Sequence, residues 1–231
     1  PLRWESFTYN TGVSGAQSVI QQRPDLGGVQ MTIGNTAGDT TVRQSRPYHR
    51  YQPGKTMFMA TALWFGPAAN GQIQRVGFFD DGNGIFFEQA NTIAGTGAGQ
   101  NNNTGMGVVI RSDVTGLQYA NSAAGSYPFN TDTRIEMGSW NGDKNIINSI
   151  NWNTIQMLWM EYAWYGAGAL RWGVFLDGQP YELHRMGMGN KTATSTYLAN
   201  SSPWSRTGNL PVRYEQRNVT NQAGAGANTT M

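Results

Sequence analysis

The pattern of apolar and polar positions indicates short β-strands separated by glycine-bearing turns. Residues 74–79 (QRVGFF) and 85–88 (IFFE) are rich in aromatic and β-branched side chains, and the sequence DDGNG at 80–84 separates them. This arrangement predicts a β-hairpin, because Asp, Asn and Gly readily adopt the backbone conformations of tight turns. Residues 106–111 (MGVVIR) predict a further strand. The first half of the chain therefore contains a hairpin followed by another strand.

The second half carries the strongest strand signals. Residues 154–165 (TIQMLWMEYAWY) and 169–176 (ALRWGVFL) predict two strands, and Asp177 and Gly178 lead into a third at 181–185. A two-residue Asp-Gly loop indicates a type I′ hairpin turn, which needs positive φ at both central positions. Length alone also allows a helix over 154–165, but its Trp, Tyr and Ile content favours a strand. Alternation predicts that four apolar side chains share one strand face: Leu170, Trp172, Val174 and Leu176.

Two further segments complete the predicted sheets. Residues 56–65 (TMFMATALWF) are apolar on both faces, which predicts a central strand, and Pro67 ends it. Residues 210–215 (LPVRYE) predict a late strand whose proline marks its first residues or an edge position. We therefore expect an all-β fold, an antiparallel two-sheet β-sandwich of jelly-roll or concanavalin/laminin-G-like type, with long Gly/Asn-rich loops such as 91–105.

Composition supports a folded chain of low charge. Among 231 residues there are 30 glycines, 12% aromatic residues and only 13% charged residues, against about 25% charged in typical soluble domains. The aromatic content provides enough apolar area to offset chain entropy. We expect one domain over residues 1–220 and a flexible Gly/Ala/Asn/Thr-rich tail over 221–231.

Charge and cysteine content exclude several classes of function. A net charge of +2 is too small for the basic surface that phosphate-backbone binding requires, so nucleic acid is not an expected partner. No apolar run approaches the roughly 18 residues that span a bilayer, so we expect no membrane insertion. The absence of cysteine removes disulfides and thiolate chemistry. Arginine outnumbers lysine, 13 to 3, which is typical of surfaces that other proteins cover, although codon usage explains it equally well.

The sequence offers little for catalysis. The only histidines are His49 and His184, and we expect His184 to be a surface or satisfied core histidine. Glycosidases on two-sheet sandwiches need paired carboxylates, and no E-x-D-x-x-E run occurs; Glu161 has no acidic partner on its predicted strand. We therefore expect neither an enzyme nor a cofactor.

One turn carries residues that bind metal ions in other proteins. Asp80, Asp81 and Asn83 could supply oxygen ligands to calcium. The same residue types are also good turn formers, and the loop lacks the closing glutamate of a twelve-residue calcium loop. The turn interpretation is favoured, and calcium remains the alternative.

Tryptophans crowd the second half of the chain, and most of them should lie in the core. One or two exposed tryptophans could anchor a protein interface or stack on a sugar. The residues that we consider for such contacts are Trp140, Trp164, Tyr165, Trp204 and Arg206.

Five sequence blocks, in this order, resemble virion structural proteins of tailed phages, especially aquatic ones, with related sequences in other large DNA viruses. They are residues 75–88 (RVGFFDDGNGIFFE), 109–112 (VIRS), 140–144 (WNGDK), 171–178 (RWGVFLDG) and 210–215 (LPVRYE). The resemblance implies a sandwich displayed on the particle surface, as a capsid decoration, a fibre or a tail component. It supplies no catalytic residues.

Three hypotheses follow. The first is a virion structural protein that forms homo-oligomers or cements capsid subunits through an Arg/aromatic surface. The second is a lectin-like receptor-binding module of a tail fibre that recognises host glycans. The third, a hydrolase, needs two carboxylates about 5 to 10 Å apart in a cleft.

Overall fold

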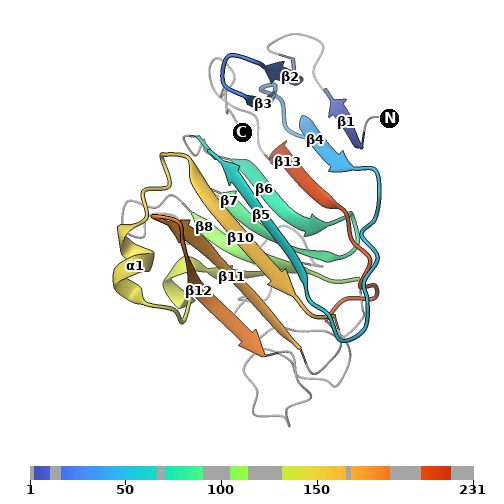
Figure 1. Cartoon of the computed structure of the whole chain (residues 1–231). Helices are drawn as coiled ribbons and strands as arrows, with labels where there is room; N and C mark the ends of the chain where they lie inside the picture. Colours follow the sequence, from blue (N-terminus) through green and yellow to red (C-terminus); the bar gives the residue numbers. More distant parts are fainter. Residues whose placement is uncertain are drawn as a thin grey trace.

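The computed structural model confirms an all-β fold in which two antiparallel sheets pack face to face as a sandwich (Figure 1). A short two-stranded hairpin lies beside one end of the larger sheet. The structure describes residues 3–10, 17–66, 71–90, 105–113, 132–164, 168–187 and 204–219. The long loop expected at 91–105, apart from Gly105, and the tail expected at 221–231 lie outside these residues.

The larger sheet has seven antiparallel strands whose spatial order differs from their order in the chain. The last strand of the chain pairs with two strands from the first third of it, and so lies inside the sheet. From edge to edge the strands are β1 (Trp4–Tyr9), β4 (Thr40–Ser45), β13 (Val212–Asn218), β6 (Gln72–Phe79), β7 (Gly84–Ala90), β8 (Met106–Arg111) and β9 (Asp132–Glu136).

The smaller sheet has four antiparallel strands and lies in front of the larger one in Figure 1. Its strands, in spatial order, are β12 (Gln179–Gly187), β11 (Ala169–Leu176), β10 (Gln156–Tyr162) and β5 (Met57–Leu63). The separate hairpin consists of β2 (Val19–Arg23) and β3 (Gly28–Thr32).

Two short helical segments precede β10. They are the 3₁₀ helix η1 (Met137–Ser139) and the helix α1 (Lys144–Ser149), whose N-cap residue Asp143 accepts a hydrogen bond from the Asn145 backbone. Within the described ranges, neither segment is long enough to cross a bilayer.

The core lies between the two sheets and is built from alternate residues of each strand, because successive strand side chains point to opposite faces. Trp140 packs edge-on against Trp152 and Trp172 at its centre. The predicted face of β11 is confirmed: three of its four apolar side chains are buried, and Leu176 packs partly buried against the same cluster. Representative inward residues are Val76, Phe78, Ile85, Phe87, Val108, Leu158, Met160, Leu170, Trp172 and Val174.

The local predictions are confirmed where a turn joins neighbouring strands. β6 and β7 form the predicted hairpin, and β8 has the predicted bounds. Asp177 and Gly178 have φ of 50° and 77°, as the type I′ turn requires. Residues 156–162 form a strand and not a helix.

One prediction about strand position is corrected, and one of the two alternatives for Pro211 is confirmed. β5 is an edge strand and not a central one, and its side chains alternate between the core and an exposed outer face. Its continuous apolar sequence arises because the outer face is apolar too. Pro211 precedes β13, so it marks the start of the strand, while the strand itself lies between β4 and β6 and not at an edge.

Candidate functional site

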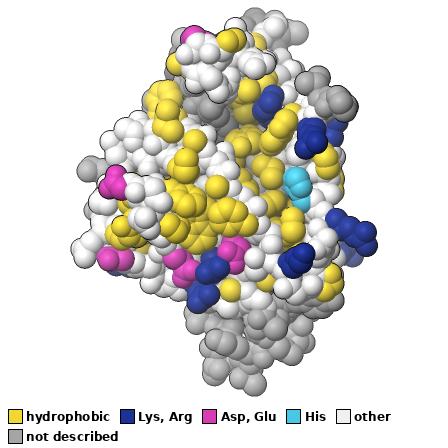
Figure 2. Space-filling view, viewed as in Figure 1, with side chains coloured by type: hydrophobic (Ala, Val, Ile, Leu, Met, Phe, Trp, Pro, Cys, Tyr) yellow, Lys and Arg dark blue, Asp and Glu magenta, His cyan; other side chains and the backbone are white. Residues whose placement is uncertain are grey.

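The outer face of the smaller sheet is apolar and exposed. Phe58 and Met157 are 54% and 49% exposed, and the core residues Met59 and Leu158 follow them in sequence and point to the opposite face. We call this surface the apolar face. It consists of Phe58, Ala60, Met157, Trp159 and Phe175, and Figure 2 shows a continuous hydrophobic area over these strands.

Trp159 forms the centre of the apolar face. Its ring stacks on Phe58 with centroids 6.2 Å apart and an interplanar angle of 25°. It also covers the backbone of Gly173 on the next strand, where a Cβ atom would lie 2.5 Å from the indole. The lack of a side chain at Gly173 therefore lets the indole lie against the sheet. The centre of the apolar face is therefore an aromatic ring that lies close to the sheet backbone.

Charged residues border the apolar face along one side. The Arg171 guanidinium donates to both carboxylate oxygens of Glu161, at 2.6 and 2.7 Å, and lies 3.4 Å from the Glu182 carboxylate. Arg185 is exposed on the neighbouring strand. Charges of both signs thus lie beside the apolar centre, as seen at its lower edge in Figure 2.

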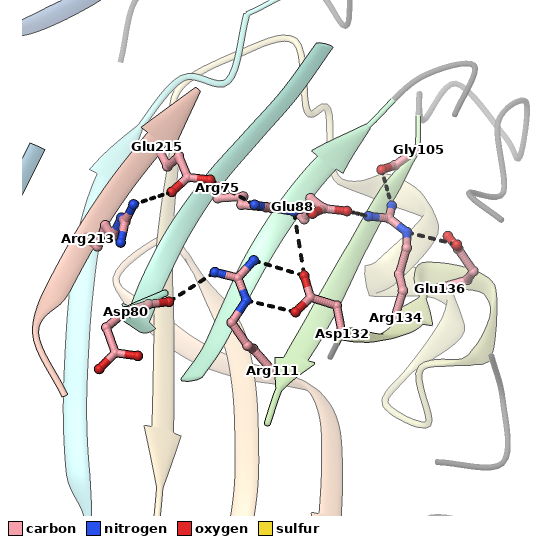
Figure 3. Close-up of polar contacts among 10 residues, drawn as sticks. All are labelled: Arg75, Asp80, Glu88, Gly105, Arg111, Asp132, Arg134, Glu136, Arg213 and Glu215. Carbon is pink, nitrogen blue, oxygen red and sulfur yellow. Dashed lines mark hydrogen bonds and ion pairs between the residues drawn. The ribbon is translucent and has the colours of Figure 1, made fainter. Parts of the chain in front are cut away.

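The outer face of the larger sheet has the opposite character, because it carries buried ion pairs (Figure 3). Arg75 is central: its Nε lies 2.8 Å from Glu88, its Nη1 2.8 Å from Glu215 and its Nη2 3.7 Å from Asp132. The Arg75, Glu88 and Asp132 side chains are at most 1% exposed. These pairs link the β13, β6, β7 and β9 strands.

Other arginines extend the pairing across the sheet. Arg111 binds Asp132 through two parallel hydrogen bonds of 2.7 and 2.9 Å. Arg134 donates to Glu88 and, at 2.8 Å, to Glu136. We call the whole set the ion network; its four arginines and four carboxylates are Arg75, Arg111, Arg134, Arg213, Glu88, Asp132, Glu136 and Glu215.

The contacts of the ion network indicate a structural role. Burial alone would raise the pKa of Glu215, but the charges of Arg75, Arg213 and Arg111 outweigh burial and hold that pKa below its usual value. The guanidinium groups of Arg75 and Arg111 also lie over the Phe86 ring, 5.1 Å from its centroid in each case. Every carboxylate of the network accepts from an arginine, which is the pairing that buried charges require.

A cleft with an acidic lining lies at the end of this sheet, beside the β6–β7 turn. Its volume is about 580 Å³, and it contains the carboxylates of Glu5, Asp80, Asp81 and Asp113 and the exposed rings of Phe7 and Tyr48. Partial burial and the neighbouring charges of Asp80 and Asp81 raise the pKa of Tyr48. We call it the acidic cleft.

The contacts of the calcium candidates are those of turn formers. Asp80 Oδ1 accepts hydrogen bonds from the backbone of Gly82 and Asn83, at 2.9 and 2.8 Å. Asp81 pairs with Arg213 at 2.7 Å, and Asn83 Oδ1 accepts from the Arg206 backbone at 3.0 Å. Within the described part of the chain, no group of three or more His, Cys, Asp or Glu side chains is placed to hold a metal ion.

Two of the tryptophans considered for external contacts are core residues, which corrects that expectation. Trp140 and Trp204 are 0% and 1% exposed, and the Trp140 indole donates to the Ile135 carbonyl at 3.2 Å. Trp164 is partly buried and donates to the Ser205 carbonyl at 2.9 Å. The segment 204–210 binds the sandwich, and its sequence gives no local signal for this.

The remaining two contact candidates differ in what can be said of them. Arg206 is exposed but is paired with Asp113 at 3.1 Å. Tyr165 lies outside the described residues. None of the four candidates that the structure describes belongs to the apolar face. Residues 56–65 are apolar on both predicted strand faces, and this pattern could have indicated the apolar face from the sequence.

His184 is a core histidine and not a surface one, so the structure decides between the two positions that the sequence allowed. It is fully buried, stacks on Trp172 with centroids 4.5 Å apart, and its Nδ1 accepts from the Asn141 backbone at 2.9 Å. Burial and the charge of Lys144 lower the pKa of His184 to about 4. It is therefore neutral at physiological pH and supports packing.

Comparisons with known proteins give one similarity, and it is in structure. No protein-family model matches the chain, and no curated protein matches its sequence. Among solved structures, the chain is similar to the potassium-bound crystal structure of the Emp46p carbohydrate recognition domain, with a TM-score of 0.40 and 9% identity. The match covers 95% of this chain and 83% of that one. This similarity concerns the β-sandwich fold alone.

Proposed function

We propose that the chain is a non-catalytic structural domain of a virus particle, which self-associates through the apolar face. The observation that carries the proposal is the exposure of Phe58 and Met157 on the same outer sheet face as Trp159. Contiguous exposed apolar surface with a polar border is typical of protein interfaces. The virion setting is supported by the resemblance of five sequence blocks to virion structural proteins of tailed phages. These blocks are residues 75–88, 109–112, 140–144, 171–178 and 210–215.

The charged border supports a second copy of the chain as the partner. A two-fold interface brings the same patch of two subunits together, so it must be self-complementary. The border provides both signs, with Glu161 and Glu182 beside Arg171 and Arg185. A surface of uniform charge would repel its own copy.

Sedimentation velocity tests this proposal. Phe58→Ser together with Met157→Ser should convert the oligomer to a monomer, because both side chains are about half exposed and contribute little to the fold. The matched control is Val19→Ser with Leu26→Ser, which removes two comparably exposed apolar side chains from the β2–β3 region and should leave the oligomer intact. A wild-type chain that stays monomeric at high concentration contradicts the proposal.

The particle setting has its own test. Purified virions labelled with an antibody against this chain should carry it on their surface, and cryo-electron microscopy density should contain the two-sheet sandwich with the apolar face against a neighbouring subunit. Particles that lack the chain, or that hold it with the apolar face exposed, contradict the virion role or the contact surface respectively.

The acidic cleft favours a second candidate function, which is glycan recognition. Its carboxylates and the Gln44 amide can accept hydrogen bonds from sugar hydroxyls, and Phe7 and Tyr48 can stack on the apolar face of a pyranose ring. A glycan array with the wild-type chain tests this function. Binding that is lost in Phe7→Ser with Tyr48→Ser supports it, and an array without hits removes it.

A further inference from the structure

A second cavity lies where three sheets meet, away from the acidic cleft. Its volume is about 260 Å³. β1, β4 and β13 contribute Trp4, Arg43 and Tyr214, while β3 contributes Val29 and Met31 and the edge of β5 contributes Leu63. At this end the β2–β3 hairpin contacts β1 and β4 of the larger sheet, and β3 lines the cavity together with the edge of β5.

The aromatic wall of this cavity is held in place by the register of the larger sheet. Arg43 and Tyr214 are directly opposite each other on β4 and β13. The Trp4 and Tyr214 rings lie 5.9 Å apart, and the Arg43 guanidinium lies 5.3 Å from the Trp4 ring centroid. The Tyr214 hydroxyl is 2.8 Å from Thr61 Oγ1, which orients the phenol ring. The wall is therefore formed before any ligand enters.

Arg43 differs from the arginines of the ion network. Each of those four arginines contacts a carboxylate within 3 Å. Arg43 is partly buried at the cavity wall, and among the described residues it makes no ion pair; its partner is the π face of Trp4. A guanidinium held on an indole keeps its N–H groups free to bind a carboxylate in a bidentate manner.

We propose that this cavity binds a ligand that joins an apolar group of about one ring to a single carboxylate. Trp4, Tyr214 and the aliphatic residues would enclose the apolar group, and Arg43 would bind the carboxylate. A cation would be repelled by Arg43. A hydroxyl-rich ligand would lose its hydrogen bonds to water against the apolar residues Val29, Met31 and Leu63.

Fluorine NMR with two small probes tests the proposed chemistry. 4-Fluorophenylacetate should show saturable line broadening with the wild-type chain. 4-Fluorophenylacetamide has the same ring but no charge, and it should bind at least about tenfold more weakly, because hydrogen bonds between charged groups are stronger than neutral ones. Equal binding of the two probes, or no binding of the carboxylate, overturns the proposal.

Charge-matched variants assign the binding to the cavity. Arg43→Gln should weaken binding of the carboxylate probe about tenfold or more. Arg50→Gln removes the same charge from an exposed position outside the cavity and should leave binding unchanged. Arg43→Lys keeps the charge without the planar fork, so it should recover part of the affinity. Circular dichroism and the melting temperature establish that each variant is folded. Loss of binding in Arg50→Gln equal to that in Arg43→Gln contradicts the assignment.

The carboxylate could belong to a free small molecule or to the end of a polypeptide, and a third comparison separates these sources. A hexapeptide ending in 4-fluorophenylalanine with a free carboxylate is compared with the same peptide as its amide. Binding of the free-carboxylate peptide alone identifies a polypeptide terminus as the ligand. Binding of 4-fluorophenylacetate without either peptide identifies a small molecule. Binding of the amide as strongly as the acid overturns the proposal.

Discussion

The outer faces of the two sheets differ in which side chains they bury and which they expose. The larger sheet buries three arginines and the carboxylates of Glu88, Asp132 and Glu215, whereas the smaller sheet leaves Phe58 and Met157 exposed. An antiparallel sandwich usually presents polar side chains on its outer faces. The comparison indicates that the ion network completes its interactions within the chain, while the apolar face still has apolar surface to remove from water. The ion pairs are made within the chain, and the contact surface proposed above lies on the other sheet.

The largest expected effect is on the ion network. Arg75→Met removes a partner of both Glu88 and Glu215 while the carboxylates stay buried, so the free energy of unfolding should fall by about 3 to 5 kcal/mol. Urea denaturation followed by tryptophan fluorescence measures it. The control is Arg23→Met in an exposed pair with Asp25, which should lose little or no stability because water and salt screen exposed charges. Equal losses of unfolding free energy in the two variants would contradict the prediction that the buried network matters more to stability than an exposed ion pair.

Acidification should reduce the stability contributed by the two sheets in different pH ranges. In the smaller sheet, the pKa of His184 is about 4 in the folded chain and roughly 6.5 when unfolded, so the unfolded state binds the proton first. The stability that depends on neutral His184 is complete above about pH 6.5 and falls by up to about 3 kcal/mol as the pH drops to 4. His184→Asn keeps an acceptor for the Asn141 backbone and should abolish this slope.

The ion network should respond at lower pH. The lowered pKa of Glu215 means that its contribution is present above its unfolded pKa, roughly 4.3, and is lost as the pH falls through the folded pKa. The two windows should appear as separate slopes in a plot of unfolding free energy against pH. A single slope that survives in His184→Asn would contradict the assignment.

A smaller effect is expected from the glycine beneath the apolar face. In Gly173→Ala the new methyl group would meet the Trp159 ring at 2.5 Å and the Tyr181 carbonyl oxygen at 2.0 Å, so the melting temperature should fall with a loss of about 1 to 3 kcal/mol. Gly187→Ala is the matched control on the adjacent strand, because its methyl group meets nothing within 4 Å. Similar melting temperatures for the two variants would show that Trp159 is not packed against the sheet backbone.

The smallest effect should come from the exposed apolar residues themselves. In dilute protein, Phe58→Ser with Met157→Ser should lower the free energy of unfolding by about 1 kcal/mol, because Phe58 stacks on Trp159 but both side chains are about half exposed. At high concentration the wild-type chain alone should gain stability, because association stabilises the folded state by mass action. Thermal unfolding over a hundredfold range of concentration measures both. A large loss in dilute protein would mean that the apolar face belongs to the fold and not to an interface.

The sequence predicts the features that depend on neighbouring residues. The turn at Asp177 and Gly178 and the β6–β7 hairpin follow from residue types that favour one backbone conformation. The hairpin even contains part of the ion network, since Arg75 and Glu88 lie directly opposite each other. Opposite charges at paired positions of a hairpin attract each other, so this ion pair could have been predicted from the strand register.

Features that depend on distant pairing could not be predicted in the same way. Nothing local in residues 210–215 indicates that β13 lies between β4 and β6. The same limit applies to the tryptophans. Trp159 lies in the apolar segment 156–162 but covers Gly173 on the outer face, whereas Trp140 lies among the polar and glycine residues of 138–144 but fills the core. In a segment that is apolar on both faces, alternation does not tell which face is inward.

The central place of β13 has a consequence for the newly synthesised chain. Because β13 joins β4 to β6, the larger sheet stays divided into two parts until residues 212–218 have left the ribosome. Until then β4 and β6 each carry an unpaired edge, and such edges promote aggregation. A chain cut short before residue 212 should therefore aggregate, because β4 and β6 would both keep an unpaired edge.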